Sequence, residues 1–303
     1  MTIKRDRKLR ETWIGQETSI ELLLSRAGMS DCNTTTTPCA QGVTLQKKKA
    51  EEPVVEAHQY RSIVALANYI ACWTRPDITF IVNKLCKYMS EPNGIHWQVL
   101  KHLLRYLKAT TKVGLHYKFA DDTTSLHGFS DSSFADCIDT GRSTLAVYGS
   151  AIISWYSKHN TYVTTSTNHS EYAALAVAAK EGEWLLALTE HLEPVAGPLP
   201  IYVDNSGIVA MTLNPVDHQA NKNIRVTCHY VRELVANKVI IPIRVPTEDN
   251  IADILTAAVH QVCESPSSTK HKHSDYHDAN KSETQFVFRK IPDGGKSSKN
   301  LSC

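Results

Sequence analysis

The sequence predicts an α/β fold in which a mixed five-stranded sheet is flanked by helices and preceded by a mainly helical region. Residues 60–117 carry apolar side chains at helical spacing, which predicts packed helices. Residues 126–257 alternate short strand-like runs with longer helical runs. Carboxylates in this second stretch stand at strand ends or helix starts, and open α/β sheets bind ligands outside the carboxyl ends of their strands. We therefore expect a functional site in the second half of the chain.

Length, charge and cysteine content set broad limits. With 303 residues, 42% of them hydrophobic, the chain can form two modest domains. A formal net charge of +2 does not demand a nucleic-acid partner, so any basic surface for one has to be local. The eight cysteines form no CxxC pair, and the sequence shows neither a signal peptide nor an apolar run that could span a bilayer. We expect reduced thiols and an intracellular protein.

The first fifty residues predict two paired strands, a helix and a linker. The strands are expected within residues 2–15, and the helix within residues 17–29, where Gly28 ends it. Turn residues, a Thr run, a Lys run and Pro53 follow. This composition is typical of a linker.

Three helices are predicted between Tyr60 and Tyr117. The first ends before Pro76, which breaks a helix, and Asp77 is placed to cap the second. The third helix has an apolar stripe of Trp97, Leu100, Leu104 and Leu107. It also has a separate basic stripe of Lys101, Arg105, Lys108 and Lys112. A solvated helix face is the ordinary explanation of a basic stripe, and contact with nucleic-acid phosphates is the functional one.

Strands and helices alternate after Leu126. The strands are expected at LHGFSD, STLAVYGSA, IISWYSK, PLPIYVD and VIIPIRV. The helices are expected at HSEYAALAVAAKEGEWLLALTEHL, NSGIVAMTL, NKNIRVTCHYVRELVAN and EDNIADILTAAV. Alanines make the first half of the first of these helices slim enough to pack close to a sheet.

Asp131, Glu171, Asp204 and Asp253 are the candidate catalytic and metal-binding residues. Parallel pairing of the strands that carry Asp131 and Asp204 would bring both acids to one edge of the sheet. Neighbouring carboxylates repel one another unless cations lie between them, and hard oxygen ligands suit Mg²⁺ or Mn²⁺. Two such ions can help to deprotonate water and stabilise an in-line transition state. The pattern therefore predicts metal-assisted hydrolysis.

Each acid also has a purely structural interpretation. Asp131 suits an Asx turn, and Glu171 suits the far half of a variant capping box. Asp204 suits a helix cap, and Asp253 suits a solvated acid in a first helical turn. The occurrence of all four in this order favours the metal site.

The second half of the chain closely resembles the ribonuclease H domain of copia-type retrotransposon polyproteins. The matching motifs are SD followed by a Ser/Phe/Ala-rich turn, RST ahead of a strand, ISWYSK, SEYAAL, VDNSGIVA, NPVDH, HYVREL and VPTEDNIADILT. The block before it resembles the connection region of the same polyproteins, through YRSIVA, TRPDI and HWQVLKHLLRYLKATTKVGLHY. The first residues, with KRDRK, WIGQ and GMSDCN, resemble the part just after the polymerase palm.

This resemblance implies a ribonuclease H-like fold and a division into domains. The implied domains are 1–52, the end of the reverse transcriptase region with a linker; 53–120, the helical connection region; 121–262, the ribonuclease H-like domain; and 263–303, a disordered tail. A chain of this kind acts in the cytoplasm, in a virus-like particle, or in the nucleus.

The resemblance also implies a function, which is Mg²⁺-dependent cleavage of the RNA strand of RNA:DNA hybrids by the four acids. The products are a 3′-hydroxyl and a 5′-phosphate, and the 2′-hydroxyl distinguishes the strand to be cut. The basic stripe, which in the family lies along the duplex, is expected to contact nucleic acid, together with Ser132 and Asn205. The polymerase part of the same element is an expected partner.

The Phe119-Ala120-Asp121-Asp122 motif has the form of the paired-aspartate signature of reverse transcriptases. Its flanks, KFADDTTS, are polar, whereas that signature lies between apolar strands. We therefore expect the chain to begin after the polymerase active site and to synthesise no DNA alone.

Two departures from the family favour an alternative function. KNIR at 222–225 replaces K-H-I-D, so that Arg225 takes the place of an acid, and LTA at 255–257 replaces LTK. The four acids are untouched, but the changes suit a catalytically inactive remnant, or a co-opted protein, that only binds nucleic acid. In the polar tail, His271, His273 and His277 are interpreted as solvated residues rather than a transition-metal site.

Overall fold

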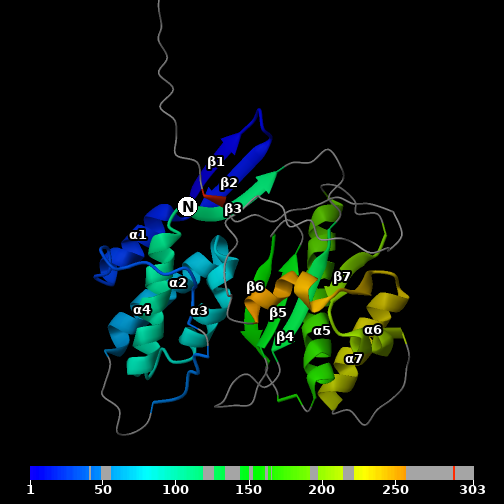
Figure 1. Ribbon diagram of the computed structural model, residues 1–303. Coiled ribbons are helices and arrows are strands. Elements are labelled where there is room, and N and C mark those ends of the chain that lie inside the picture. Colours follow the sequence, from blue (N-terminus) through cyan, green and yellow to red (C-terminus); the bar gives the residue numbers. More distant parts are fainter. Residues whose placement is uncertain are drawn as a thin grey trace, which may run out of the picture.

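The computed structural model of the chain has a helical half and a sheet half (Figure 1). It describes residues 1–40, 42–48, 56–118, 126–133, 144–149, 153–160, 163–164, 166–191, 197–213, 222–256 and 289–290. The motif at 119–122 and the three tail histidines lie outside these residues.

Four α-helices build the first half. They are α1 (Glu17–Arg26), α2 (Ala57–Trp73), α3 (Thr79–Cys86) and α4 (Gly94–Ala109). Their apolar faces meet in one core, in which the predicted stripe of α4 is confirmed: Leu100, Leu104 and Leu107 are buried and Trp97 packs at the border. Gly28 ends α1 as predicted. It has a φ of +65°, and the next amide, of Met29, donates to the Leu24 carbonyl at 2.8 Å.

Asp77 does not cap α3, so that expectation was wrong. It lies in the 3₁₀ turn η1 (Pro76–Ile78), where it is 2% exposed. Its carboxylate accepts hydrogen bonds from Arg75, at 2.9 Å from Nε and 2.7 Å from Nη2, and from the Tyr106 hydroxyl at 2.7 Å. Arg75 Nη1 in turn donates to the Thr110 carbonyl at 2.9 Å. The carboxylate therefore ties the end of α2 to α4 instead of serving a helix N-terminus.

The segment that follows α1 is packed more tightly than a linker. Cys39 and Leu45 are buried in the helical core. The Tyr88 hydroxyl donates to the Leu45 carbonyl at 2.9 Å, and Lys108 Nζ donates to the Cys32 carbonyl at 2.8 Å. Two isolated apolar side chains thus anchor a stretch whose turn-rich composition predicted no packing.

A small sheet connects the start of the chain to the end of the helical region. It contains β1 (Thr2–Asp6), β2 (Glu11–Gly15), β3 (Val113–Lys118) and β9 (Arg289–Lys290), in that spatial order. The predicted hairpin β1–β2 is confirmed, and β2 pairs antiparallel with β3. Trp13 stands opposite His116, and their rings stack with centroids 4.8 Å apart. The first residues therefore pack with the helical region.

The second half contains the predicted mixed five-stranded sheet. Its strands are β4 (Gly128–Ser133), β5 (Thr144–Gly149), β6 (Trp155–His159), β7 (Leu199–Val203) and β8 (Ile240–Arg244). The spatial order is β6-β5-β4-β7-β8. The first three strands pair antiparallel, whereas β4–β7 and β7–β8 are parallel. This arrangement confirms the predicted fold class.

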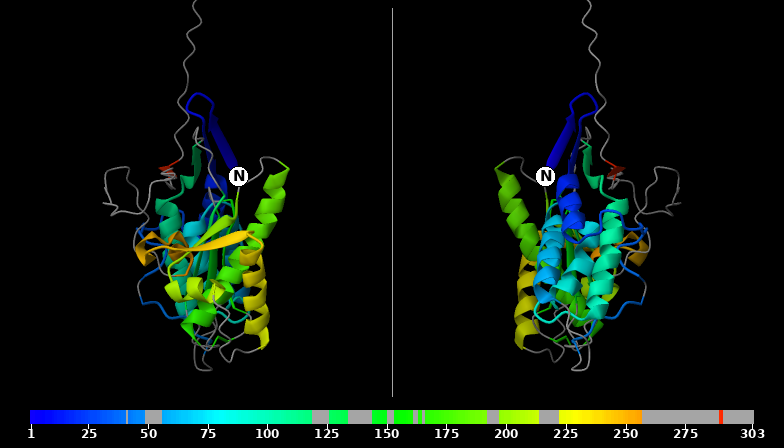
Figure 2. Two further views of the ribbon diagram at one scale, coloured as in Figure 1. Left: turned by 90° about the vertical axis from the view of Figure 1, so that its right-hand side faces the viewer. Right: turned by 90° about the vertical axis from the view of Figure 1, so that its left-hand side faces the viewer.

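Three α-helices pack against this sheet and against one another. They are α5 (Thr167–Glu190), α6 (Ser206–Leu213) and α7 (Lys222–Ala236). Figure 2 shows α5 and α7 on one side of the sheet and the orange 3₁₀ segment η4 on the other. Helix α5 approaches β7 closely at Gly182, where an added Cβ would stand 2.3 Å from the Leu199 Cδ2 atom.

The predicted last α-helix is instead two 3₁₀ turns within the described residues, η3 (Thr247–Asp249) and η4 (Ile251–Leu255). Asn250 stands between them in an extended conformation, with φ −79° and ψ 96°, and its side chain accepts a hydrogen bond from the Ala252 amide at 3.3 Å. This local cap interrupts the helix that the sequence pattern favoured.

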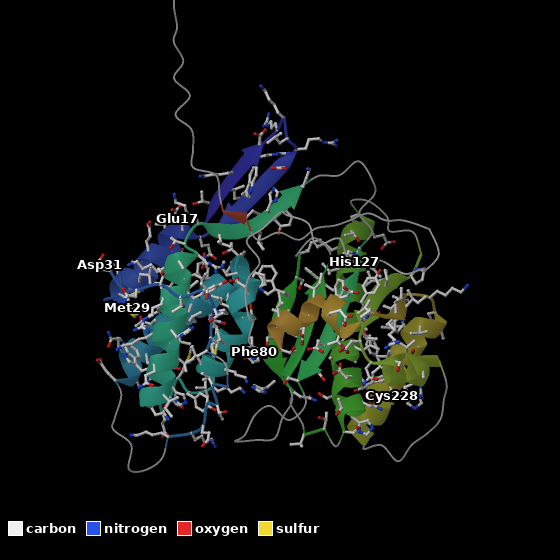
Figure 3. The ribbon with its side chains drawn as sticks, viewed as in Figure 1. Glu17, Met29, Asp31, Phe80, His127 and Cys228 are labelled. Atoms are coloured by element: carbon white, nitrogen blue, oxygen red, sulfur yellow. The ribbon has the colours of Figure 1, made fainter. Side chains whose placement is uncertain are left out.

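The two halves are joined by direct contacts. The Trp155 indole of β6 donates to the Ala71 carbonyl of α2 at 3.0 Å, and Asn83 Nδ2 of α3 donates to the Ser157 hydroxyl at 3.4 Å. Figure 3 shows Phe80 of α3 on the side of the helical half that faces the five-stranded sheet. Among the helices that the structure describes, none is both long and apolar enough to cross a membrane.

Candidate metal centre

The parallel register of β4 and β7 places Asp131 beside Asp204. Gly128 of β4 stands opposite Ile201 of β7. Asp131 and Asp204 each lie three residues further along these two strands, so the same register brings them to neighbouring positions. Asp131 is inside β4 and is 7% exposed, and Asp204 directly follows β7. The Asx-turn interpretation of Asp131 is therefore excluded.

Glu171 comes from the second turn of α5. The N-cap of this helix is Ser166, whose side chain accepts a hydrogen bond from the His169 amide at 3.3 Å. Because the cap is formed there, Glu171 is not half of a capping box. It is 6% exposed, and α5 packs against β4 and β7.

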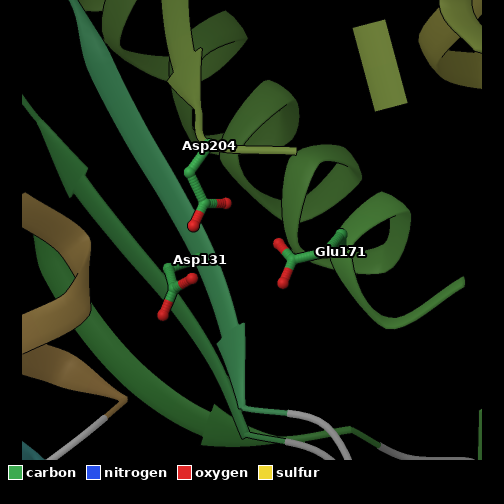
Figure 4. A group of neighbouring side chains, drawn as sticks. All are labelled: Asp131, Glu171 and Asp204. Carbon is green, nitrogen blue, oxygen red and sulfur yellow. The ribbon is translucent and has the colours of Figure 1, made fainter. Parts of the chain in front are cut away.

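The three carboxylates point toward one another, as Figure 4 shows. One oxygen from each of Asp131, Glu171 and Asp204 lies within 4.8 Å of the other two. Three elements far apart in the sequence, β4, α5 and the end of β7, thus form one acidic cluster.

The environment of this cluster disfavours the charged form of two of its members. The pKa of Glu171 is raised from 4.5 to about 8, mainly by burial and also by the negative charge of Asp131. Burial also raises the pKa of Asp131 from 3.8 to about 6, with smaller contributions from the charges of Asp253 and Asp204. A cation placed among the carboxylates would remove this cost.

The donor atoms fit Mg²⁺ or Mn²⁺. All ligand atoms of the cluster are carboxylate oxygens, which are the ligands that these hard cations prefer. Among the described residues, the cluster includes no His or Cys of the kind that zinc or copper sites use. Asp131, Glu171 and Asp204 would hold the ion.

Each carboxylate of the cluster accepts a hydrogen bond from a neighbouring hydroxyl group. Ser132 Oγ donates to Glu171 Oε1 at 2.9 Å, Thr247 Oγ1 donates to Asp204 Oδ2 at 3.1 Å, and Thr256 Oγ1 donates to Asp131 Oδ2. The hydrogen bonds of Thr247 and Thr256 to the acids were not predicted from the sequence. The available signal was weak: Thr256 follows Asp253 by three residues, which is one turn of a 3₁₀ helix.

Asp253 lies at the border of the cluster. It is exposed in η4 and does not belong to the group of three whose oxygens converge. Desolvation raises its pKa, and the negative charge of Asp204 raises it further. The structure therefore brings three of the four predicted acids together and places the fourth within electrostatic reach.

Asn205 has defined partners beside the acids. Its Nδ2 donates to Asn168 Oδ1 at 2.9 Å, and its Oδ1 accepts from the Gly207 amide at 2.9 Å, which caps α6. A Cβ at Gly207 would stand 3.0 Å from that Oδ1 atom. This crowding explains why glycine occupies the first turn of α6.

The basic stripe of α4 contains residues in different settings. Lys101 and Arg105 are exposed on α4, whereas Lys108 is half-buried and donates to the Cys32 carbonyl. Lys112 is exposed but lies beyond the end of α4 at Ala109, so the expectation that the helix carries it was wrong. Lys101 Nζ lies 5.9 Å from the centroid of the Trp97 ring. Contact between this stripe and nucleic acid stays a prediction, and Lys108 has a structural partner of its own.

Comparison with known proteins shows extensive similarity to transposon polyproteins, although no family model matches the chain. The chain is 32% identical over 267 residues to the retrovirus-related Pol polyprotein from transposon TNT 1-94 of Nicotiana tabacum. That alignment covers 86% of this chain and 20% of the relative. It is 35% identical over 238 residues to the corresponding polyprotein from transposon RE1 of Arabidopsis thaliana, covering 77% of this chain and 16% of the relative. The chain thus spans a fifth or less of these relatives.

Among solved structures, LC11-RNase H1 in complex with an RNA/DNA hybrid is 17% identical, with a TM-score of 0.34, and the match covers 43% of this chain and 93% of that one. The assignment of the fold rests on the strand order β6-β5-β4-β7-β8, with α5 packed against β4, and not on this likeness. The chain has a ribonuclease H-like fold and belongs to the retrovirus-related Pol polyproteins of copia-type transposons.

Proposed function

We propose that this chain is a Mg²⁺-dependent ribonuclease H that cuts the RNA strand of RNA:DNA hybrids. The observation that supports this proposal most strongly is the convergence of Asp131, Glu171 and Asp204, with one oxygen of each within 4.8 Å of the others. Structural acids have no reason to converge in this way, because mutual repulsion and burial both cost free energy. A divalent cation bound among the three carboxylates, as ribonuclease H activity requires, would offset that cost.

The residues of the chain hold and orient the reacting groups. Two acids come from adjacent parallel strands and one from a packed helix, so their positions are fixed by the fold rather than by a loop. A bound Mg²⁺ or Mn²⁺ would supply Lewis-acid activation of water and stabilise charge on the phosphate. Exposed Asp253 stands where it could complete the acidic rim.

Recognition of the RNA strand is assigned to the polar groups around the acids. Only RNA offers a 2′-hydroxyl, which both donates and accepts hydrogen bonds. The side-chain amides of Asn168 and Asn205, which are bonded to each other, retain further donor and acceptor capacity beside the cluster. They are therefore candidates for contact with a sugar of the RNA strand.

The helical half is proposed to lie along the duplex through the exposed residues Lys101 and Arg105 of α4 and Lys112 beyond its end. Such phosphate contacts set affinity and register without reading sequence. The polymerase part of the same polyprotein is the proposed protein partner. The site of action, cytoplasm or nucleus, stays a prediction.

Incubation of the purified chain with Mg²⁺ and an RNA:DNA hybrid labelled on the RNA strand tests the proposal. The expected result is cleavage of the RNA strand that EDTA abolishes, with no cleavage of duplex DNA. Asp131→Asn and Asp204→Asn should each remove cleavage, whereas Asp31→Asn, which changes an exposed acid of the helical half, should retain it. Equal product from the wild type and Asp131→Asn would reject the assignment.

A second candidate function is nucleic-acid binding without catalysis. The sequence departure at Arg225, on α7, favours it because a base replaces an acid of the family pattern. This candidate expects salt-sensitive binding of the hybrid without turnover. The same cleavage assay decides between the two.

A further inference from the structure

The segment from Thr247 to Thr256 forms hydrogen bonds to β4 and to the residue that follows β7. Thr247 Oγ1 donates to Asp204 Oδ2 at 3.1 Å, and Thr256 Oγ1 donates to Asp131 Oδ2. Between them, Asn250 Nδ2 donates to the Ser130 carbonyl of β4 at 3.1 Å. One short segment therefore contacts two of the three clustered acids and the strand that carries one of them.

The middle of the segment is fixed by burial as well. Asn250 is 4% exposed, and Ala252 and Leu255 are fully buried in a cluster with Phe129 of β4. Phe129 and Asp131 are two residues apart on one strand and so share a face of the sheet. The apolar contact with Phe129 holds residues 247–256 in the position in which Thr247 and Thr256 bond the carboxylates.

Among the residues that the structure describes, each of the three hydroxyls bonds one oxygen of its carboxylate. Oδ2 of Asp131, Oδ2 of Asp204 and Oε1 of Glu171 each accept a bond from a hydroxyl, the last from Ser132. Each hydroxyl restricts rotation of its carboxyl group and so helps to fix the orientation of that group in the cluster. Hydrogen-bond partners of metal ligands act in this way in other metal sites, where removing one costs 10–100-fold in metal affinity or activity.

We infer that Thr256 and Thr247 are positioning residues for the divalent-cation site, acting through the carboxylates of Asp131 and Asp204, with Ser132 in the same role for Glu171. The inference rests on the proposed function. Thr256 has the larger effect, because it is 3% exposed whereas Thr247 is exposed, and a buried hydrogen bond to a charged group contributes more than a solvated one.

Valine replacements test the inference, because valine keeps the branched shape of threonine and removes the hydroxyl. Thr212→Val is the matched control: Thr212 is 6% exposed in α6, and its hydroxyl donates to the Val209 carbonyl at 2.7 Å, away from the acids. Thr256→Ser restores the hydroxyl and serves as the rescue variant. The measurements are the dissociation constant for Mn²⁺ by titration calorimetry and the urea midpoint of the metal-free protein.

The expected result is a loss of Mn²⁺ affinity of about 10-fold or more in Thr256→Val, a smaller loss in Thr247→Val, and wild-type affinity in Thr256→Ser and Thr212→Val. Thr256→Val with wild-type Mn²⁺ affinity would overturn the inference. So would an affinity loss in Thr256→Ser equal to that in Thr256→Val, because the hydroxyl would then not matter.

If Thr256→Val fails to fold, the comparison of Thr256→Ser, Thr247→Val and the wild type still tests the same point. Failure of the proposed function has a different signature. In that case the wild-type protein itself would neither bind Mn²⁺ at the cluster nor cleave the hybrid.

Discussion

Among the clustered acids, Glu171 has the most strongly raised pKa. Its pKa of about 8 means that the metal-free protein holds a proton on this carboxyl at neutral pH, mainly because of burial. A cation can coordinate only the deprotonated group. Metal binding at this site is therefore a competition with a proton.

We predict that Mn²⁺ or Mg²⁺ binding releases protons at pH 7 and that the apparent affinity rises between pH 6 and pH 8. Asp131, with a pKa of about 6, adds to the lower part of this range. Titration calorimetry in two buffers with different ionisation enthalpies measures the released protons directly. Equal heats in both buffers, with affinity independent of pH, would contradict a proton on Glu171 in the metal-free protein.

The raised pKa of Glu171 also affects the free energy of unfolding of the metal-free protein. The folded protein binds the Glu171 proton more tightly than the unfolded chain, whose ordinary pKa is 4.5. The contribution of Glu171 to the free energy of unfolding is therefore fully present below about pH 4.5 and is lost progressively as the pH rises to about 8.

We predict that Glu171→Gln stabilises the protein in EDTA at pH 8 by at least about 1 kcal/mol, because each pKa unit corresponds to about 1.4 kcal/mol. The variant and the wild type should converge near pH 4.5. Urea denaturation across this pH range is the measurement, with Glu190→Gln, an exposed acid of the same helix, as the control. An equal pH slope in Glu171→Gln and the wild type would contradict the burial of this carboxyl.

Among the secondary-structure elements, the 3₁₀ turn η1 links the end of α2 to α4 through the buried pair of Arg75 and Asp77. Asp77→Asn should destabilise the protein by about 3–5 kcal/mol, because the guanidinium, which is fully buried, would lose its countercharge. Urea unfolding measures the loss, and Asp31→Asn, on the surface, should change stability by less than about 0.5 kcal/mol. A loss in Asp77→Asn as small as in the control would mean that the pair does not hold the helices.

The elements themselves were largely predictable from the sequence. The α4 stripe of Leu100, Leu104 and Leu107 and the stop at Gly28 follow from helical periodicity and left-handed backbone, which are local properties. The role of Asp77 was not predictable, because its partner Tyr106 is 29 residues away. The interruption at Asn250 was missed for a related reason: besides its local bond to the Ala252 amide, its side chain bonds the backbone of β4, a contact that no local pattern encodes.

The acids were predictable to a similar extent. The order and local context of Asp131, Glu171 and Asp204 indicated one site, although Asp131 lies inside β4 and Glu171 in the second turn of α5 rather than at a strand end and a helix start. The position of Asp253 outside the converging group depended on the 3₁₀ geometry of η4, which the sequence pattern presented as an α-helix. The hydroxyls of Thr247 and Thr256 were missed because threonine has too many ordinary structural roles.

The contacts between the helical half and the sheet half join them into one body. The Trp155 indole bonds α2, and α3 lies against β6, so a duplex bound along α4 would be held in a fixed relation to the acids. Phosphate contacts by exposed residues of α4 would then contribute to hybrid affinity.

We predict that Lys101→Ala with Arg105→Ala weakens hybrid binding and lowers the slope of log affinity against log salt by roughly one for each lost phosphate contact. Lys108→Ala is the comparison, because its ammonium group already bonds the Cys32 carbonyl. Fluorescence anisotropy of a labelled hybrid over a salt series measures both quantities. If the double variant keeps the wild-type slope, α4 does not contact the duplex.

Titration of Mn²⁺ into the wild type and into three single variants, Asp131→Asn, Glu171→Gln and Asp204→Asn, tests whether the three carboxylates form one cation site. Because the three carboxylates form one cluster, each replacement should weaken the same binding event, by about 10-fold or more, although the residues lie on different elements. Wild-type affinity in any one of the three would contradict a shared site.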